Sequence, residues 1–166
     1  LSHNHYDHMD FPSLVQLARL NPNTQVFVPL KNSRVVKRAG FRKVTEADWF
    51  DTHHFAGMRF TAVPAVHSSR RSITDLNRSL WSGWSIRGAG RKIYFAGDTA
   101  KGSFIHEIRR RLGAHELALM PIGAYAPPEL ERGQHATPEE SVYMARQLGA
   151  RHIIPTHWGT FALTRE

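Results

Sequence analysis

The stretch at residues 3–8, HNHYDH, places His3, His5, Asp7 and His8 within six positions. Side chains two apart in an extended segment point the same way, so His3 and His5 can hold one metal ion together. Asp7 and His8 follow a predicted turn and can reach a second ion nearby. A lone histidine is usually a solvated or core residue, but four metal-competent side chains at this spacing are rarely surface decoration. The stretch therefore predicts a metal site for two ions.

Three further candidate ligands come at the ends of predicted strands. His67 closes MRFTAVPAVH, Asp98 follows RKIYFAG, and His157 follows RHIIPT. Ligands gather at the carboxyl ends of strands in α/β sheets, so this placement brings distant residues to one edge. The expected ligands are His3, His5 and His67 for one ion, Asp7, His8 and His157 for the other, with Asp98 bridging both. Imidazole and carboxylate ligands favour zinc, with manganese and iron as alternatives.

The composition removes several other kinds of chemistry. The chain of 166 residues has no cysteine, which excludes thiolate ligands and a disulfide framework. The sequence also lacks a GxSxG motif, so nothing points to a covalent serine or cysteine nucleophile. Two neighbouring ions can instead share a hydroxide and polarise the ester under attack.

The charge balance is strongly basic, with a formal net charge of +8. A basic surface favours anionic partners such as phosphate esters, acidic lipid headgroups or nucleic acid, and the alternative is a solvated basic face without a specific partner. The basic residues are scattered rather than striped with stacking aromatics, which argues against nucleic acid.

No apolar run reaches the roughly 20 residues of a membrane span. Because the start is too polar for a signal peptide, we expect a cytoplasmic protein, with peripheral contact to an anionic membrane as a further expectation. The sequence leaves the oligomeric state open.

Short apolar strands alternate with amphipathic helices, which predicts one α/β domain over residues 1–166. The clearest helix start is Thr137-Pro138-Glu139-Glu140, with a capping threonine, a proline at the first position and a glutamate three residues after the cap. Helices are expected at 11–20, 32–39, 103–113 and 137–148, and strands at 24–30, 58–67, 79–88, 91–99, 116–123 and 151–158. Only Leu1 and Ser2 precede the HNHYDH segment, although such a loop needs a supporting strand. We therefore expect that an N-terminal β-rich portion is missing, and that the C-terminus is truncated as well.

Together these segments resemble a known family. SHNHYDHMD, VHSSRRSITDLNRSLWSGW, FAGDTA, MPIGAY, HATPEES and THWGTF follow in the order seen in the metallo-β-lactamase superfamily, in particular its N-acyl-phosphatidylethanolamine-hydrolysing phospholipase D branch and bacterial relatives. The resemblance implies an αββα sandwich, two zinc ions on the seven ligands named above, and phosphodiester hydrolysis by metal-bound hydroxide. It also implies catalytic roles for Asp7, Asp98 and His135.

His135 matches a family histidine on the substrate side of the site. It lies two residues before Thr137, beside a helix N-terminus, where an anion is favoured. The alternative is a solvated loop histidine. The stretch Ser68-Ser69-Arg70-Arg71 departs from the family pattern of an aromatic or small residue followed by Gly-Arg, which changes the expected local substrate contact. Solvated or core roles are expected for the other histidines, His53, His54, His106, His115 and His152.

The leading hypothesis is a binuclear zinc phosphodiesterase that acts on a phospholipid or a similar phosphodiester. The alternative is a lactonase, or another carboxylic ester or amide hydrolase, on the same metals. A nuclease-type nucleic-acid-binding protein is a weaker hypothesis. A last alternative is a fragment that is inactive because its missing half supplies part of the pocket.

Overall fold

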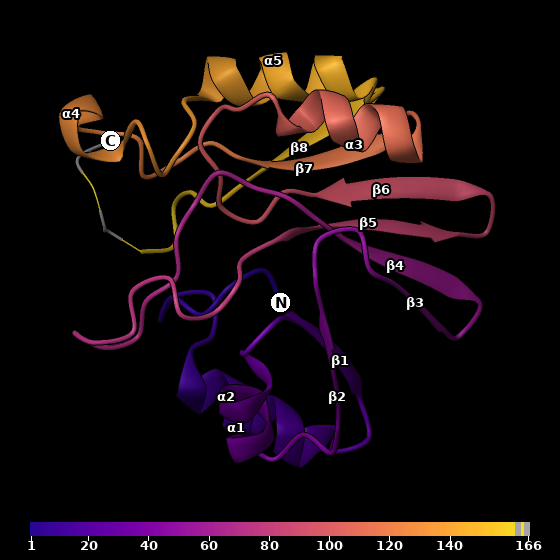
Figure 1. Cartoon of the computed structure of the whole chain (residues 1–166), viewed down its shortest axis with the longest axis vertical. Coiled ribbons are helices and arrows are strands. Elements are labelled where there is room, and N and C mark those ends of the chain that lie inside the picture. The colour runs from indigo at the N-terminus through magenta and orange to yellow at the C-terminus, as the bar shows by residue number, and fades with distance from the viewer. Residues whose placement is uncertain (162–163, 165–166) are drawn as a thin grey trace.

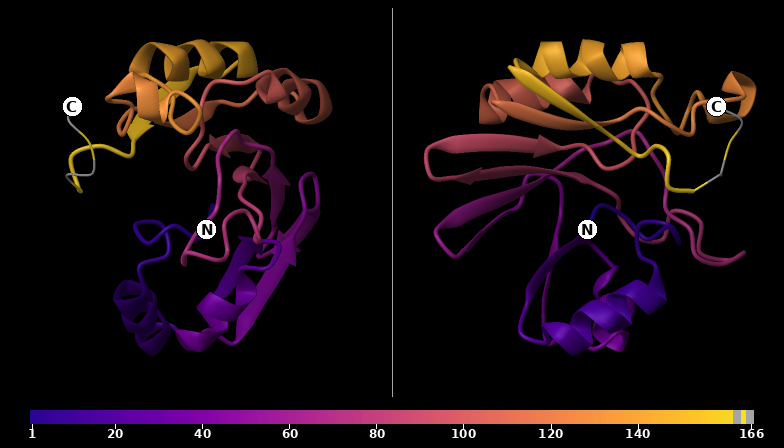
Figure 2. Two further views of the ribbon diagram at one scale, coloured as in Figure 1. Left: turned by 60° about the vertical axis from the view of Figure 1, so that its left-hand side comes forward. Right: turned by 180° about the vertical axis from the view of Figure 1, so that it is seen from behind.

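The protein is built in four layers, α/β/β/α, seen from three directions in Figures 1 and 2. The computed structural model describes residues 1–161 and residue 164. One outer layer contains α1 (Phe11–Leu20) and α2 (Ser33–Arg38), which pack on the parallel pair β1 (Gln25–Pro29) and β2 (Lys43–Ala47). The opposite outer layer contains α3 (Phe104–Leu112) and α5 (Pro138–Leu148), while the short α4 (Pro128–Glu131) lies apart from it. The layer order αββα expected from the resemblance is confirmed.

The larger sheet has six strands in sequence order: β3 (Thr52–Phe55), β4 (Met58–Val63), β5 (Gly83–Gly88), β6 (Arg91–Phe95), β7 (Leu117–Pro121) and β8 (His152–Thr156). The first four strands pair with their neighbours in antiparallel fashion, and the long segment 64–82 connects β4 to β5. The pairs β6–β7 and β7–β8 are parallel, with α3 and α5 as their crossovers. As a result β4, β6, β7 and β8 all end at the same edge of the sheet.

Apolar side chains hold each pair of layers together. Tyr94, Ile108 and Met144 belong to the cluster between the six-stranded sheet and helices α3 and α5. Trp84, with Phe27 and Phe60 packed beside it, belongs to a smaller cluster between the two sheets. Burial of this apolar surface supplies the main stabilisation of the sandwich.

The predicted helix ends are confirmed by their capping groups. The side chain of Asp10 accepts a hydrogen bond from the Ser13 amide at 2.9 Å, which caps α1. Thr137 and Glu140 form the expected reciprocal capping box at the start of α5. Gly149 ends α5 with φ of +77°, in the left-handed region that glycine adopts most easily.

The predicted strands are too long at the ends that carry the candidate ligands. β4 stops at Val63 rather than residue 67, β6 stops at Phe95 rather than residue 99, and β8 stops at Thr156. The chain leaves the sheet after each of these residues, and the ligands lie on the segments that follow. Strand 79–88 likewise begins at Gly83, because the preceding Ser82 amide bonds to the Ser2 carbonyl instead of a sheet neighbour.

Three short elements are absent from the sequence-based expectation: β2, β3 and α4. Each spans only four or five residues, and β3 reads THHF, which has no apolar alternation to mark it. Within the described part of the chain, no helix has both the length and the apolar character needed to cross a bilayer.

Candidate metal centre

The HNHYDH segment is folded into a compact turn at the sheet edge. The carbonyl of His5 accepts hydrogen bonds from the amides of His8 at 3.2 Å and Met9 at 2.9 Å. The buried Ser2 hydroxyl contacts Nδ1 of His3 at 3.1 Å. This turn reverses the chain between His5 and Asp7, so side chains from both arms face the ends of β6 and β8.

Three imidazole nitrogens converge on one point. His3 Nε2 lies 2.9 Å from His5 Nδ1, and His67 Nε2 lies 3.2 Å from each of these atoms. Three mutual contacts cannot all be donor–acceptor pairs, so at least two like groups face each other. Ligand nitrogens around a tetrahedral zinc ion, each about 2.0–2.1 Å from the metal, lie roughly 3.4 Å apart. The spacing therefore fits a shared cation. The Nδ1 atom of His67 also contacts the Gln134 carbonyl at 2.9 Å, which orients the ring.

A second group, beside the first, mixes carboxylates with imidazoles. His8 Nε2 lies 3.1 Å from Asp7 Oδ2 and 2.9 Å from Asp98 Oδ2. His157 Nε2 approaches the same two oxygens, at 3.4 Å from Asp7 and 3.3 Å from Asp98. The arrangement offers two nitrogens and two oxygens to one small volume, a donor set that suits zinc, iron or manganese.

Asp98 lies between the two groups. Its Oδ2 atom is 3.8 Å from Nε2 of both His3 and His67, in addition to its contacts in the second group. Its Oδ1 atom is buried and has no hydrogen-bond partner among the described residues. Leaving a buried carboxylate oxygen unpaired is costly, so this atom is suited to a cation. We call these seven residues the histidine–aspartate cluster: His3, His5, Asp7, His8, His67, Asp98 and His157.

The protonation states of the cluster fit metal binding. Burial lowers the pKa of His67 to about 4 and that of His3 well below its usual value, so these rings are neutral near pH 7. Burial alone would lower the pKa of His8, but the carboxylates of Asp7 and Asp98 raise it to about 9. Burial would raise the pKa of Asp98, yet the hydrogen bond and charge of His8 hold it below its usual range. Neutral imidazoles and ionised carboxylates are the forms that bind metal. The raised pKa of His8 shows that the two carboxylates stabilise a positive charge at this position, which a metal ion would supply in place of the proton.

His135 also lies against the cluster. Its ring stacks on His157, with centroids 5.4 Å apart and planes 11° from parallel, and meets His67 edge-on at 5.2 Å. Its Nδ1 atom is buried without a hydrogen-bond partner among the described residues. His67, Asp98 and His135 lie close enough together to form a third group of potential ligands. The structure thus places His135 with the seven predicted ligands, just before the N-terminus of α5.

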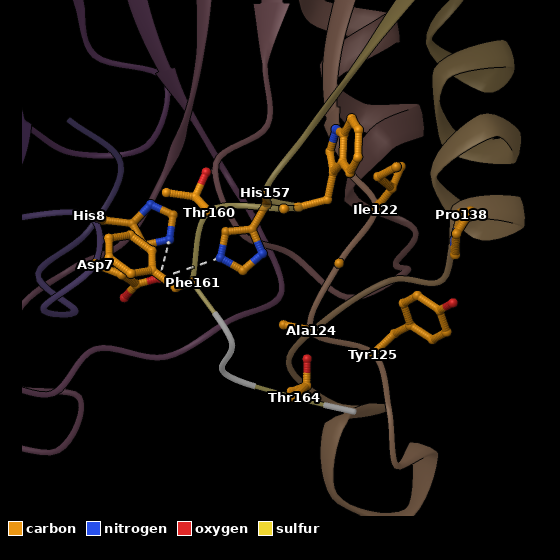
Figure 3. Close-up of a pocket in the computed structure, with 13 residues that line it drawn as sticks. Asp7, His8, Ile122, Ala124, Tyr125, Pro138, His157, Thr160, Phe161 and Thr164 are labelled. Atoms are coloured by element: carbon orange, nitrogen blue, oxygen red, sulfur yellow. Dashed lines mark hydrogen bonds and ion pairs between the residues drawn. The ribbon is translucent and has the colours of Figure 1, made fainter. Parts of the chain in front are cut away.

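A cavity of about 530 Å³ opens next to the second group. Asp7, His8 and His157 form one side of it, and Ile122, Tyr125 and Trp158 contribute to the rest of the wall (Figure 3). Ile122 and Tyr125 were not expected near the site. Both belong to the MPIGAY segment, which runs past the end of β7, and this position at a strand end is the one sequence signal that could have identified them.

The remaining histidines lie outside the cluster, as expected. His54, His106 and His152 are exposed. His53 is half-buried and stacks on Phe27 with ring centroids 5.6 Å apart. His115 is fully buried in the sheet layer, where its Nε2 contacts the Ser85 hydroxyl at 2.8 Å. Of the two roles expected for it, solvated or core, His115 therefore has the core role.

Comparison with known proteins agrees with this geometry. Residues 1–158 match the family described as the beta-lactamase superfamily domain. The chain is 37% identical over 173 residues to the N-acyl-phosphatidylethanolamine-hydrolyzing phospholipase D 1 of Caenorhabditis elegans, covering 98% of this chain and 49% of that protein. It is 31% identical over 167 residues to a metal-dependent hydrolase of Rubrobacter xylanophilus, covering 97% of this chain and 63% of that protein. The chain thus spans about half the length of the phospholipase that it resembles.

A solved structure shows the same fold. Igni18, a metallo hydrolase from Ignicoccus hospitalis, superposes with a TM-score of 0.77 at 22% sequence identity, over 100% of this chain and 65% of that one. At this identity the likeness speaks for the fold alone. The predicted resemblance to the superfamily and to its phospholipase D branch is confirmed.

Proposed function

Since the chain belongs to the beta-lactamase superfamily, we propose that it forms the catalytic part of a binuclear, zinc-dependent hydrolase that cleaves phosphodiesters. The observation that carries the proposal is the pair of adjoining ligand groups that share Asp98. Three nitrogens of one group lie within 3.2 Å of one another, and the second group brings two carboxylates beside two imidazoles. Such a donor set is costly without a cation and is ready to bind one.

The seven residues of the histidine–aspartate cluster would hold the two ions. His3, His5 and His67 would bind one, Asp7, His8 and His157 the other, and Asp98 would bridge them. Bound zinc would supply an activated water molecule and polarise the phosphoryl group. Manganese or iron would satisfy the same ligands.

The chain's own residues have three further tasks in this proposal. Asp7 and Asp98 offset the charge of the cations and keep the neighbouring imidazoles in place. His135 hydrogen-bonds to a non-bridging phosphate oxygen or protonates the leaving oxygen, since it faces the cluster from beside His67 and His157. The nearby N-terminus of α5 favours the same negative charge.

The cavity beside the second group supports a substrate with an apolar part. Ile122, Tyr125 and Trp158 line the same cavity as Asp7 and His8, and Figure 3 shows Ile122 and Tyr125 across from these two residues. A phosphodiester with a hydrocarbon chain would place its charge at the cluster and its chain along this wall. The phospholipase D name of the Caenorhabditis elegans relative points the same way. In this proposal the +8 charge assists peripheral contact with an anionic membrane.

A substrate panel tests the proposal. The zinc-loaded full chain is offered N-acyl-phosphatidylethanolamine in mixed micelles, bis(p-nitrophenyl) phosphate, an aliphatic lactone and a β-lactam. We expect hydrolysis of both phosphodiesters, with the lipid preferred in kcat/KM. Turnover of the lactone alone would replace the phosphodiesterase with the alternative carboxylic ester hydrolase on the same metals.

A further inference from the structure

Arg71 reaches the HNHYDH segment from a separate loop and closes it from outside. One guanidinium nitrogen, Nη1, donates to the carbonyl of Asn4 at 3.0 Å and to that of Met9 at 2.9 Å. These two carbonyls flank the turn that carries His5, Asp7 and His8. The contacts join residues more than 60 positions apart in the sequence. Arg71 thus ties together the two ends of the turn that supplies ligands to both groups.

A side chain within the turn contacts Arg71 as well. The guanidinium carbon of Arg71 lies 4.2 Å from the centre of the Tyr6 ring, a close cation–π contact. The Tyr6 hydroxyl donates to the Arg71 carbonyl at 2.8 Å. Arg71 is therefore engaged from three points of the segment, Asn4, Tyr6 and Met9. A half-buried arginine with these partners is ordered by the turn, and it orders the turn in return.

The loop that carries Arg71 is itself fixed. Asp75 Oδ1 accepts hydrogen bonds from the amides of Arg71 at 3.0 Å and Ser72 at 2.7 Å. At the base of the loop, the Ser69 hydroxyl donates to the Ser79 carbonyl, and the Asn4 amide group donates to the Ser79 hydroxyl at 2.7 Å. The arginine therefore projects from a rigid support toward the ligand-bearing turn.

From these contacts we infer that Arg71 is a positioning residue of the metal centre, acting through the main chain of the HNHYDH segment. The inference rests on the proposed metal-binding function. Groups that orient metal ligands change metal affinity by roughly 10- to 100-fold when they are removed. His5 belongs to one ligand group, while Asp7 and His8 belong to the other. Loss of Arg71 should therefore weaken the binding of both ions.

The adjacent Arg70 provides a matched control. It is exposed, carries the same charge, and its Nε atom donates to the Ser72 carbonyl of its own loop at 3.0 Å. Arg70→Ala removes one positive charge at nearly the same place without touching the turn. Any effect confined to Arg71 then reports its contacts rather than the local charge.

The test measures metal affinity in the full chain by competition with a chromophoric chelator, using zinc and cobalt(II). We expect Arg71→Ala to bind both ions about 10- to 100-fold more weakly and to alter the visible spectrum of bound cobalt, whereas Arg70→Ala matches the parent. Millimolar methylguanidinium should restore affinity and spectrum to Arg71→Ala. Arg71→Lys keeps a donor but loses the planar stack, so it should fall between parent and Arg71→Ala.

Thermal unfolding of the metal-free proteins separates positioning from general stability. A parent protein that binds no metal would remove the proposed function itself. A parent that binds two ions, with an Arg71→Ala variant of equal affinity and unchanged cobalt spectrum, would overturn the positioning role alone. A second outcome would also overturn the positioning role. In that outcome Arg71→Ala loses metal affinity and unfolding temperature together, and methylguanidinium restores neither. General destabilisation of the fold would then explain the weaker metal binding.

Discussion

Two places in this molecule bury histidine, and they differ in what the rings face. In the histidine–aspartate cluster, the nitrogens of His3, His5 and His67 face one another. In the sheet layer, His115 faces the hydroxyl of Ser85. Burial lowers the pKa of His115 to about 4, the same value as for His67. Burial and a lowered pKa therefore fail to separate a metal ligand from a core residue.

What separates the two places is the supply of hydrogen-bond donors. A hydroxyl can donate to an imidazole or accept from it, so the contact between the Ser85 hydroxyl and His115 Nε2 is a hydrogen bond in either tautomer of the ring. Three converging imidazoles beside the unpaired Oδ1 of Asp98 leave acceptors facing acceptors. A buried cation resolves that conflict. The comparison yields predictions that treat the two places as opposites.

Metal removal should have the largest effect on the cluster. We expect close to two ions per chain after mild purification, and loss of hydrolysis to background after dialysis against a chelator, with recovery when zinc is added. Elemental analysis measures the metal content, and a hydrolysis assay on the same preparation measures the activity. His115 gives the contrast, since a His115→Gln variant should contain the same amount of metal. A chain that stays free of metal when offered zinc, iron and manganese would remove the distinction between the two places.

Asp98→Asn should come next, because Asp98 contacts both ligand groups. The substitution removes one negative charge from both at once, while the size of the side chain hardly changes. We expect about a 1,000-fold loss of kcat/KM, as each 1.36 kcal/mol of lost transition-state stabilisation costs a factor of ten. Metal content should fall by at least one ion. An Asp98→Asn protein with normal turnover and metal content would place Asp98 outside the site.

His135→Ala should have a smaller effect, of a different kind. His135 touches the cluster but is expected to act on the substrate, so both metals and the fold should be retained. The rate on aliphatic phosphodiesters should fall about 100-fold or more, within the usual range of general acid–base assistance. The loss should shrink for a nitrophenyl diester, whose leaving group needs little protonation. Parental rates on every phosphodiester, together with a collapse of lactone hydrolysis, would support the lactonase instead.

His115→Ala should leave metal content and activity intact and change only stability. It leaves Ser85 without its partner and opens a cavity in the core, at a cost of about 2–4 kcal/mol. His106→Ala, at an exposed position of α3, serves as the matched control and should stay within about 0.5 kcal/mol of the parent. Urea unfolding of the chelated proteins measures both variants. Equal stability of the two would contradict the assignment of His115 to the core.

The same residue predicts a pH dependence of stability. Burial, with a further contribution from the charge of Lys92, lowers the pKa of His115 to about 4 in the folded protein, against about 6.5 in the unfolded chain. The unfolded chain therefore binds the proton first as the pH falls, so stability from this group is lost between about pH 6.5 and pH 4. His115→Gln should be less stable than the parent at pH 8 but lose less of its stability over that interval.

Much of the candidate site could be predicted because its residues lie at characteristic positions in the sequence. The HNHYDH stretch stands out because it has four potential metal ligands within six residues. His67, Asp98 and His157 each follow an apolar strand, and these strands end at the same edge of the sheet. The strand ends could not be predicted, since Pro64 and Ala65 continue the apolar run of β4 after its pairing with β5 has ended at Val63. An extended segment has the same sequence pattern whether or not it pairs with a neighbour.

Other features were hidden because they depend on main-chain atoms or on distant loops. In the sequence, Arg71 was noted only because the stretch after His67 departs from the family pattern. That departure was expected to change the local substrate contact. Its partners are carbonyl groups of Asn4 and Met9, which every residue type provides. Likewise, Tyr125 lines the same cavity as the second ligand group only because β7 and β8 lie side by side.

Gly123 gives the ligand His157 a constraint that no ligand motif records. A methyl group at position 123 would lie 2.1 Å from the His157 carbonyl oxygen, and His157 itself has φ of +59°. The loop after β8 is thus moulded against the bare main chain after β7. For protein engineers this makes position 123 a tuning point: we expect Gly123→Ala to displace His157, one of the proposed ligands, while all seven keep their identity. The proposed ion preference could then be altered by the volume of a single methyl group, outside the set of residues that a designer would normally vary.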